Sequence, residues 1–139
     1  MAVPTRKDQY DVRVVVDGRN LGTFDVLTGG ETDTDELVYK PGGMGPQLSL
    51  GGIVTVGQTV VNRIYELDRD HATVHWLLSR VGKGQMTISK QPLDVDGNVY
   101  GKPLVYKGTL KRCTPPEVDS NSTDAAIIEL EMTPAGTVT

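Results

Sequence analysis

The stretch YDVRVVVDGRNLGTFDVL, residues 10–27, decides the fold class of this chain. Polar and apolar residues alternate over residues 10–16, so that Tyr10 and three valines share one face. This period of two residues is typical of a strand with one buried side. The Asp-Gly pair in residues 17–20 predicts a tight hairpin turn, and a second strand is expected over residues 21–27. The chain therefore opens with a β-hairpin.

The same pattern continues along the chain. Gly and Pro, the residues that punctuate turns, number 16 and 8 of 139, which is more than average and favours many short strands. With the opening hairpin, the pattern predicts about seven strands. The further expected strands are residues 31–39, 53–65, 85–91, 104–112 and 124–133.

One helix is expected between residues 68 and 82. Four apolar residues recur at helical spacing and form one stripe, which predicts that the helix packs over an opening of the sheet. Asp68 or Asp70 is expected to cap its start and Gly82 its end. The stripe consists of Val74, Leu77, Leu78 and Val81.

The length of 139 residues fits a single domain over residues 1–139, and no linker divides it. The polar residues 1–9 are expected to form a flexible N-terminal arm. The predicted class is mainly β: a β-sandwich or barrel with one flanking α-helix.

Several classes of protein are disfavoured by composition. A formal net charge of −4 and few aromatic residues do not fit a protein that grips nucleic acid. Residues 1–10 hold no apolar segment, so no signal peptide is expected, and the chain has no apolar run long enough for a membrane span. The single cysteine, Cys113, allows no internal disulfide. Folding in a reducing cytoplasm is expected.

Candidate catalytic and metal sites are weak. His71 and His75 have the i, i+4 spacing that can share a metal, but Ala72 stands where a zinc protease has Glu, so they are interpreted as surface or packing residues. Residues 94–98 resemble the start of a calcium loop, but Val105 stands where the closing Glu would be, which favours a plain turn. We therefore expect no catalytic residues, no cofactor and no metal.

Two segments are unusual for a small domain. Glu31, Asp33 and Asp35 give the third strand an acidic character, which fits either a solvated edge or the lining of a channel. Residues 40–52, KPGGMGPQLSLGG, are interpreted as one long irregular loop. Because this loop carries Met44 and two leucines, it is expected to lie against another chain.

The order of these features resembles the tail tube proteins of tailed phages and of related contractile injection systems. The most specific part is the segment LVYKPGG, residues 37–43, followed by GIVTVGQTVVNR, residues 52–63. One helix with Trp76, an Asp-Gly turn and the closing strand IIELE, residues 127–131, complete the pattern. The resemblance covers about residues 10–133 and leaves contractile and non-contractile tails both open.

The resemblance implies a structural role in the virion. Hexameric rings would stack into a hollow tube by helical assembly, through which DNA passes during ejection without specific binding. Tape measure, tail tip and terminator proteins would be partners, and assembly would occur in the host cytoplasm. Glu31, Asp33 and Asp35 would face the bore, and the inter-ring loop would consist of Lys40, Pro41, Gly42, Gly43, Met44, Leu48 and Leu50.

Simple geometry makes such a tube plausible. With four strands from each copy, about 24 strands spaced ~4.8 Å and tilted ~40° enclose a diameter of roughly 48 Å. A DNA duplex, on the order of 20 Å across, would pass through it. The alternatives are a ring-forming tail terminator or head-tail connector, and a small β-sandwich binding module, which would need exposed aromatic residues on one face.

Overall fold

The computed structural model describes residues 4–136 and 138–139, without the side chains of residues 35–38 and 48–53. Within these residues, nine strands and one helix follow one another along the chain. They are β1 (Tyr10–Val16), β2 (Arg19–Phe24), β3 (Val26–Gly29), β4 (Thr32–Tyr39), β5 (Leu48–Val56), β6 (Thr59–Ile64), α1 (Leu67–Arg80), β7 (Gln85–Pro92), β8 (Leu104–Thr114) and β9 (Ile127–Pro134).

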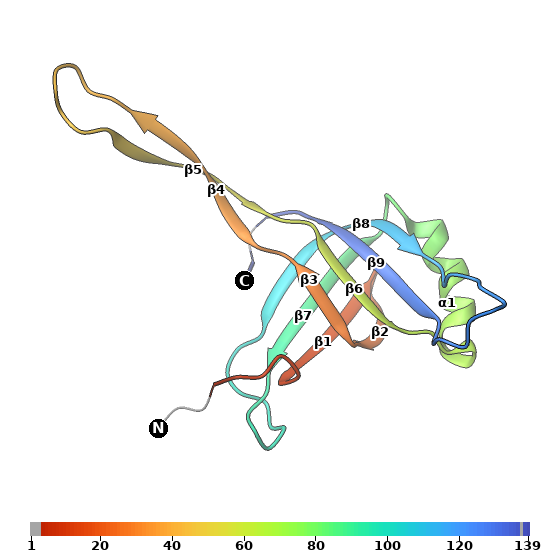
Figure 1. Ribbon diagram of the computed structural model, residues 1–139. Coiled ribbons are helices and arrows are strands. Elements are labelled where there is room, and N and C mark those ends of the chain that lie inside the picture. The colour runs from red at the N-terminus through yellow and green to blue at the C-terminus, as the bar shows by residue number, and fades with distance from the viewer. Residues whose placement is uncertain (1–3, 137) are drawn as a thin grey trace.

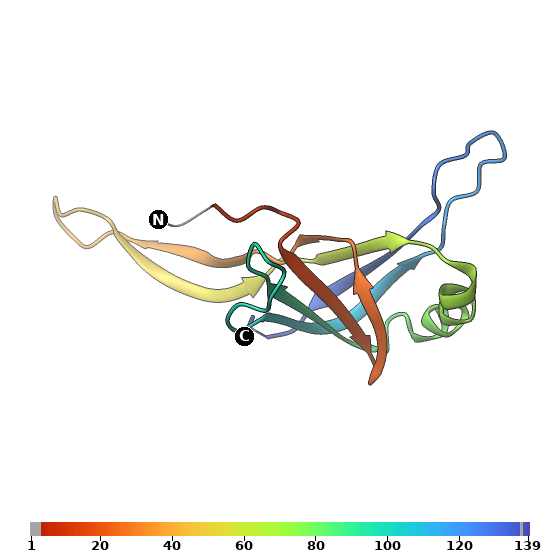
Figure 2. The same cartoon turned by 90° about the horizontal axis from the view of Figure 1, so that it is seen from below.

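Seven strands form one antiparallel sheet in the order β2-β1-β7-β8-β9-β6-β3. The sheet curls into a half-barrel (Figures 1 and 2). Only Asp25 separates β2 from β3, so the two edge strands meet at that corner. Helix α1 lies at one end of the half-barrel (Figure 1). The predicted class, a mainly β fold with one flanking helix, is confirmed.

The opening hairpin forms as predicted. Val16 pairs with Arg19 across a turn of two residues. Asp17 and Gly18 have φ angles of 49° and 81°, and positive φ at both central positions suits the right-handed twist of the strands. The Asp17 carboxylate also accepts hydrogen bonds from the Gln85 N–H at 2.9 Å and from Arg80 Nε at 2.6 Å. The turn thereby ties β1 to α1 and β7.

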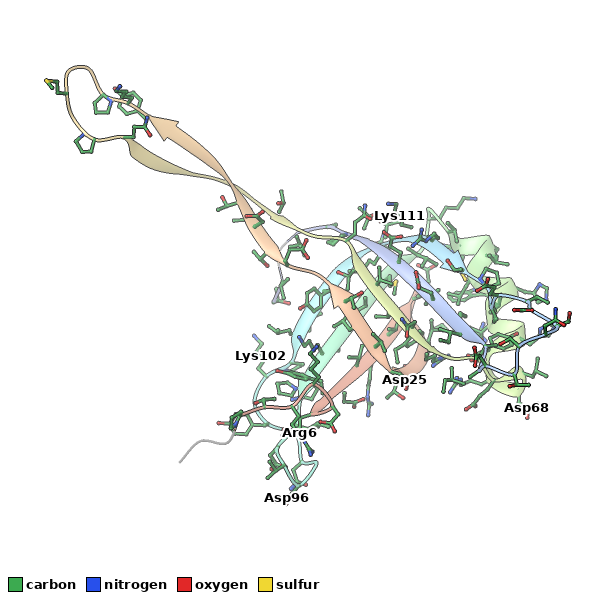
Figure 3. All side chains as sticks on the ribbon, viewed as in Figure 1. Arg6, Asp25, Asp68, Asp96, Lys102 and Lys111 are labelled. Carbon is green, nitrogen blue, oxygen red and sulfur yellow. The ribbon has the colours of Figure 1, made fainter. Side chains whose placement is uncertain are left out.

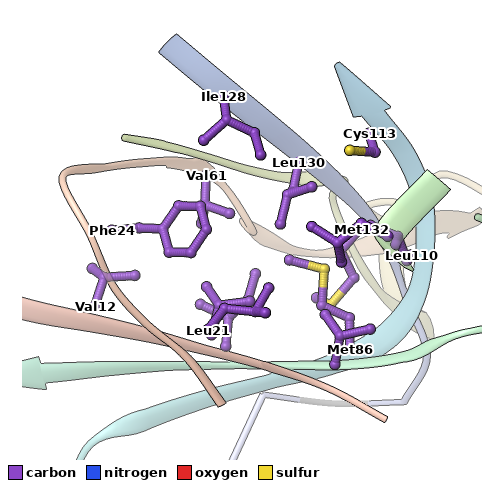
Figure 4. Packing of buried hydrophobic residues seen from close by; sticks show 14 of the residues in the cluster. Val12, Leu21, Phe24, Val61, Met86, Leu110, Cys113, Ile128, Leu130 and Met132 are labelled. Carbon is purple, nitrogen blue, oxygen red and sulfur yellow. The ribbon is translucent and has the colours of Figure 1, made fainter. Parts of the chain in front are cut away.

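The core lies on the concave side of the curled sheet and under α1 (Figure 4). The alternation predicted for the first strand is confirmed, because Val12, Val14 and Val16 are all buried. Strands β7 and β9 also turn apolar side chains into the core. The buried apolar residues of these two strands are Met86, Ile88, Ile128, Leu130 and Met132, and Glu131 of β9 is buried as well.

Two expected strands are each divided in the structure. The segment 21–27 breaks at Asp25, because β2 pairs with β1 while β3 pairs with β6 at the opposite edge of the sheet. The segment 53–65 breaks at residues 57–58, where the chain leaves the small sheet β4-β5 and joins the large one. Backbone hydrogen bonds to different partner strands, which sequence alone does not reveal, set both breaks.

The expected ends of the helix are partly wrong. Its N-cap position is Glu66, with no side-chain cap, and Asp70 is buried inside the first turns. The C-cap is Val81, and Gly82 follows it with a φ of 84°. In the predicted stripe, Val74 and Leu77 are buried, but Leu78 is 46% exposed.

The end of the N-terminal segment contacts the body of the molecule. Gln9 is buried, and its side chain donates to the Leu93 carbonyl at 3.3 Å and accepts from the Arg6 N–H at 2.8 Å. The Leu93 N–H donates back to the Gln9 carbonyl at 2.8 Å. The end of the segment 1–9 is therefore fixed to the turn after β7, and residues 1–3 lie outside the described residues.

Candidate assembly surfaces

Strands β4 and β5 form a separate two-stranded sheet, which we call the arm (residues 32–56). Figures 1 and 2 show that the arm projects well beyond the half-barrel. Residues 30–31 and 57–58 connect it to the body, and the Gly57 N–H donates to the Glu31 carbonyl at 2.7 Å there. A two-stranded ribbon alone in water is marginally stable, so contact with a partner would stabilise the arm.

The arm corrects the expected long loop. Residues 48–52 were expected to be irregular, yet they belong to β5, because Leu48 pairs with Tyr39 and Leu50 with Leu37. The glycines give this segment no local preference for a strand. Pairing with β4 satisfies its backbone N–H and C=O groups and so holds it extended. The irregular segment is therefore residues 40–47, which form the tip of the arm.

The tip carries most of the residues expected to contact another chain. Lys40, Gly42, Gly43 and Met44 are exposed, Pro41 is half-buried, and the Met44 side chain is fully exposed. Figure 3 shows the side chains of the tip standing clear of the body. The side chains of Leu48 and Leu50 lie outside the description. The exposed thioether of Met44, at the far end of the arm, is an apolar group that the described residues of its own subunit leave uncovered.

The expected bore residues lie at the root of the arm. Glu31 and Asp33 are exposed, and the Glu31 carboxylate lies against the backbone of Gly57. The Asp33 carboxylate accepts a hydrogen bond from the Thr34 N–H at 2.8 Å. Asp35 lies in β4 near a register irregularity between Thr34 and Glu36, and its side chain is outside the description. Glu31 and Asp33 thus share one exposed acidic segment.

Glycines fix the direction in which the arm leaves the body. Gly29 and Gly30 have φ angles of 81° and 77°, a region that residues with a side chain rarely adopt. A Cβ at Gly29 would overlap the Gln58 carbonyl, and one at Gly30 would lie 2.8 Å from the Tyr106 ring. The junction is thus packed tightly against the body.

A groove of about 470 Å³ lies at the other end of the molecule, between the β8-β9 loop and the start of β9. We call it the acidic groove. Its lining contains no Lys or Arg, and Glu129 is the one lining carboxylate with an ion pair among the described residues, to Arg112 at 3.4 Å. The lining consists of Asn62, Thr114, Pro115, Glu117, Asp119, Ser122, Asp124, Ala125, Ala126, Ile127 and Glu129.

Helix α1 is held beside this groove by a buried ion pair. Arg63 and Asp70, whose side chains are 4% and 0% exposed, meet at 2.6 Å. The guanidinium also donates to the backbone carbonyls of Leu21 and Thr23 in β2, at 2.5 and 3.1 Å, and lies over the Phe24 ring. One side chain thus connects β6, β2 and α1.

The Asp70 carboxylate is strongly solvated by protein groups. Arg69 Nη2 donates to it at 2.9 Å and the Glu66 N–H at 3.0 Å, besides Arg63. Burial alone would raise the pKa of Asp70, but hydrogen bonds from Arg69 and Glu66 and the charge of Arg63 hold that pKa below its usual value. The carboxylate therefore remains charged inside the fold.

The other candidate groups are a cysteine, two histidines and the turn at residues 94–98. Cys113 is buried, and burial raises the pKa of its thiol to about 11, so it is neutral near pH 7. His71 and His75 are exposed neighbours on α1 with ring centroids 5.2 Å apart, which agrees with surface histidines. The Asp94 carboxylate is engaged by the N–H groups of Asp96 and Asn98, as in a turn.

The described residues contain no group of three or more His, Cys, Asp or Glu arranged to hold a metal ion. Their helical segments are too short and too polar to cross a membrane.

Sequence reasoning missed the acidic groove and the buried ion pair. Residues 114–123 lie between two expected strands, and Glu117 and Asp119 give this segment an acidic character. Arg63 shares the buried face of β6 with Val61, and a charged residue at an expected core position is the signal that could have identified the pair.

Comparison with known proteins places the fold. No protein family model matches the sequence, and no curated protein matches it. Solved structures do match over the whole chain. A chain of the cryo-EM structure of the anti-feeding prophage (AFP) baseplate aligns with a TM-score of 0.72 at 15% identity, covering 100% of this chain and 96% of that one.

Two more solved structures agree. A chain of the AFP tube terminating cap gives a TM-score of 0.71 at 14% identity, covering 100% of this chain and 91% of that one. A chain of the sheath-tube complex of an extracellular contractile injection system, PVC, gives 0.67 at 19% identity, covering 98% and 90%. The chain therefore has, over its whole length, the fold of tail components of contractile injection systems.

Proposed function

We propose that this protein is the structural subunit of a tail tube, whose copies form hexameric rings that stack into a hollow tube. The fold shared with tail components of contractile systems supports this role and favours a contractile tail. The tube would belong to a virion or a related injection particle, with the tape measure, tail tip and terminator proteins as further partners.

The projecting arm is the observation that carries the proposal. Figure 1 shows the tip of the arm far from the half-barrel, and Met44 in this tip is fully exposed. Burial of one such side chain against another copy contributes about 2 kcal/mol, repeated at every subunit of a ring. A rod-like ribbon with an uncovered apolar end suits a contact between successive rings.

The acidic root of the arm supports a passage role. Glu31, Asp33 and Asp35 on one short segment would give the bore a negative potential, with DNA as the cargo. Because phosphate contacts hold DNA to proteins, a negative lining lets DNA slide without specific binding. Such a subunit would act by shape and charge and would perform no catalysis.

A second candidate is a tail terminator, cap or connector. The likeness to a chain of the AFP tube terminating cap favours it. Such a protein would form one ring and stop, because one of its two faces would not accept a further copy.

Negative-stain electron microscopy of the purified protein at high concentration separates these functions. Long hollow tubes are the expected result, isolated rings would favour the terminator, and monomers alone would contradict both. Replacement of residues 41–46 by Gly and Ser should abolish tubes while circular dichroism and the unfolding transition of the half-barrel stay unchanged. Tubes that persist in this variant would show that the tip is not an inter-ring contact.

A further inference from the structure

The tip of the arm and the acidic groove lie at opposite ends of the molecule. Figures 1 and 2 agree that the arm projects from one end, while the β8-β9 loop, which lines the groove, lies at the other. A contact between two different surfaces at opposite ends is heterologous. When every copy repeats it in the same direction, the copies form an open stack rather than a closed pair.

The two surfaces are complementary in charge. Lys40 is the one charged residue within residues 39–47, and it is exposed. The groove presents four carboxylates, those of Glu117, Asp119, Asp124 and Glu129, and Arg112 is the one basic side chain that ion-pairs with any of them among the described residues. A lysine at the rim of the groove is attracted by several carboxylates. This attraction favours docking of the tip at the groove over docking at a basic surface.

The two surfaces are also complementary in their apolar parts. Pro115, Ala125, Ala126 and Ile127 line the groove, and Ile127 is 50% exposed although it is apolar. The tip offers Pro41 and Pro46 beside the fully exposed Met44. An unbranched thioether adapts well to an irregular surface of this kind, and a cavity of about 470 Å³ has room for it.

We propose that the acidic groove of each copy receives the tip of the arm of a second copy in the next ring. Met44 packs against Ala125 and Ile127, while Lys40 lies at the rim near Asp124 and Glu117. The proposal rests on the tube function, and it adds which surface accepts the arm. The growing end of the tube is then a ring of empty grooves or of free tips.

Disulfide trapping tests the contact directly. The variant Met44→Cys/Ala125→Cys is made in a Cys113→Ser background and assembled into tubes under reducing conditions. Mild oxidation should then give a ladder of dimers, trimers and longer chains on a non-reducing gel. The matched control is Val95→Cys/Ala125→Cys, because Val95 is also exposed, at 65%, on a turn outside the tip, and it should give no ladder.

Charge exchange gives a second, independent readout. Lys40→Glu should raise the critical concentration for tube formation about fivefold, the scale of an exposed ion pair. The combination of Lys40→Glu with Asp124→Lys and Glu117→Lys should return the critical concentration to that of the unmodified protein. All these positions are exposed, so circular dichroism should show an unchanged fold.

The outcomes separate the two proposals. Tubes that form normally with the cysteine pair but give no ladder would overturn the docking site and leave the tube function standing. A ladder in the Val95 control equal to that of the Met44 pair would also overturn the docking site. If the unmodified protein forms no tubes, both proposals fail.

Discussion

The substitution Asp70→Asn tests whether the buried ion pair holds α1 on the half-barrel. It is nearly isosteric, but it removes the charge that balances Arg63, whose guanidinium is 4% exposed. The new amide N–H₂ would also face groups that can only donate, those of Arg69 and the Glu66 backbone. Removal of one partner from a buried pair costs about 3–5 kcal/mol, because an uncompensated charge remains inside.

That cost is large for a domain of this size. A protein of 139 residues loses about 3–4 °C of melting temperature per kcal/mol, so the variant should melt about 9–20 °C lower. Urea unfolding followed by circular dichroism should show the same loss as a lower midpoint with an unchanged slope.

A matched control lies on the same turn of the helix. Asp68→Asn removes the same charge near the same helix end, but Asp68 is exposed and should cost less than about 1 kcal/mol. Equal losses in the two variants would refute the reasoning. Arg63→Met combined with Asp70→Leu should recover most of the stability, since an apolar pair of similar volume carries no buried charge.

Because the folded-state pKa of Asp70 is lowered, the stabilisation that its carboxylate provides is present above the unfolded pKa of about 3.9 and is lost as the pH falls through the folded pKa. The difference in urea midpoint between the unmodified protein and Asp70→Asn should therefore narrow below about pH 4. Gly30→Ala should destabilise the arm junction by about 1–3 kcal/mol through its positive φ and its contact with Tyr106, whereas Gly42→Ala, which meets open space, should have no effect on thermal melting. Alkylation of Cys113 at pH 8, measured by mass spectrometry, should be at least about 100-fold slower in the folded protein than in urea. The reason is that the pKa of the thiol is about 11 in the folded protein and about 8.5 in the unfolded chain. Similar rates would show that the thiol is accessible.

The body of the fold follows closely from local sequence patterns. The alternation in residues 10–16, the Asp-Gly turn and the inward faces of β7 and β9 all depend on neighbours two to four residues apart, and such patterns are legible in a single sequence. The buried valines of β1 and the φ angles of the turn confirm them.

The arm was less predictable because its structure depends on pairing between distant residues. Residues 48–52 include two adjacent glycines and have weak strand propensity of their own. Strand β4 imposes their conformation through a register that begins at Tyr39 and Leu48. The acidic groove could not be predicted from the sequence for a similar reason, since Asn62, Asp124 and Ile127 come together only when β6 and β9 pair.

The separation of the arm from the half-barrel has a consequence for amide hydrogen exchange. Backbone amides in β7, β8 and β9 lie in a sheet with a buried face and exchange only when the body opens. Amides in β4 and β5 are protected only by each other, so in a free subunit they should exchange orders of magnitude faster. The rate of deuterium uptake over residues 32–56 would thus report assembly: uptake is slow in a copy whose arm is bound and fast in a copy whose arm is free.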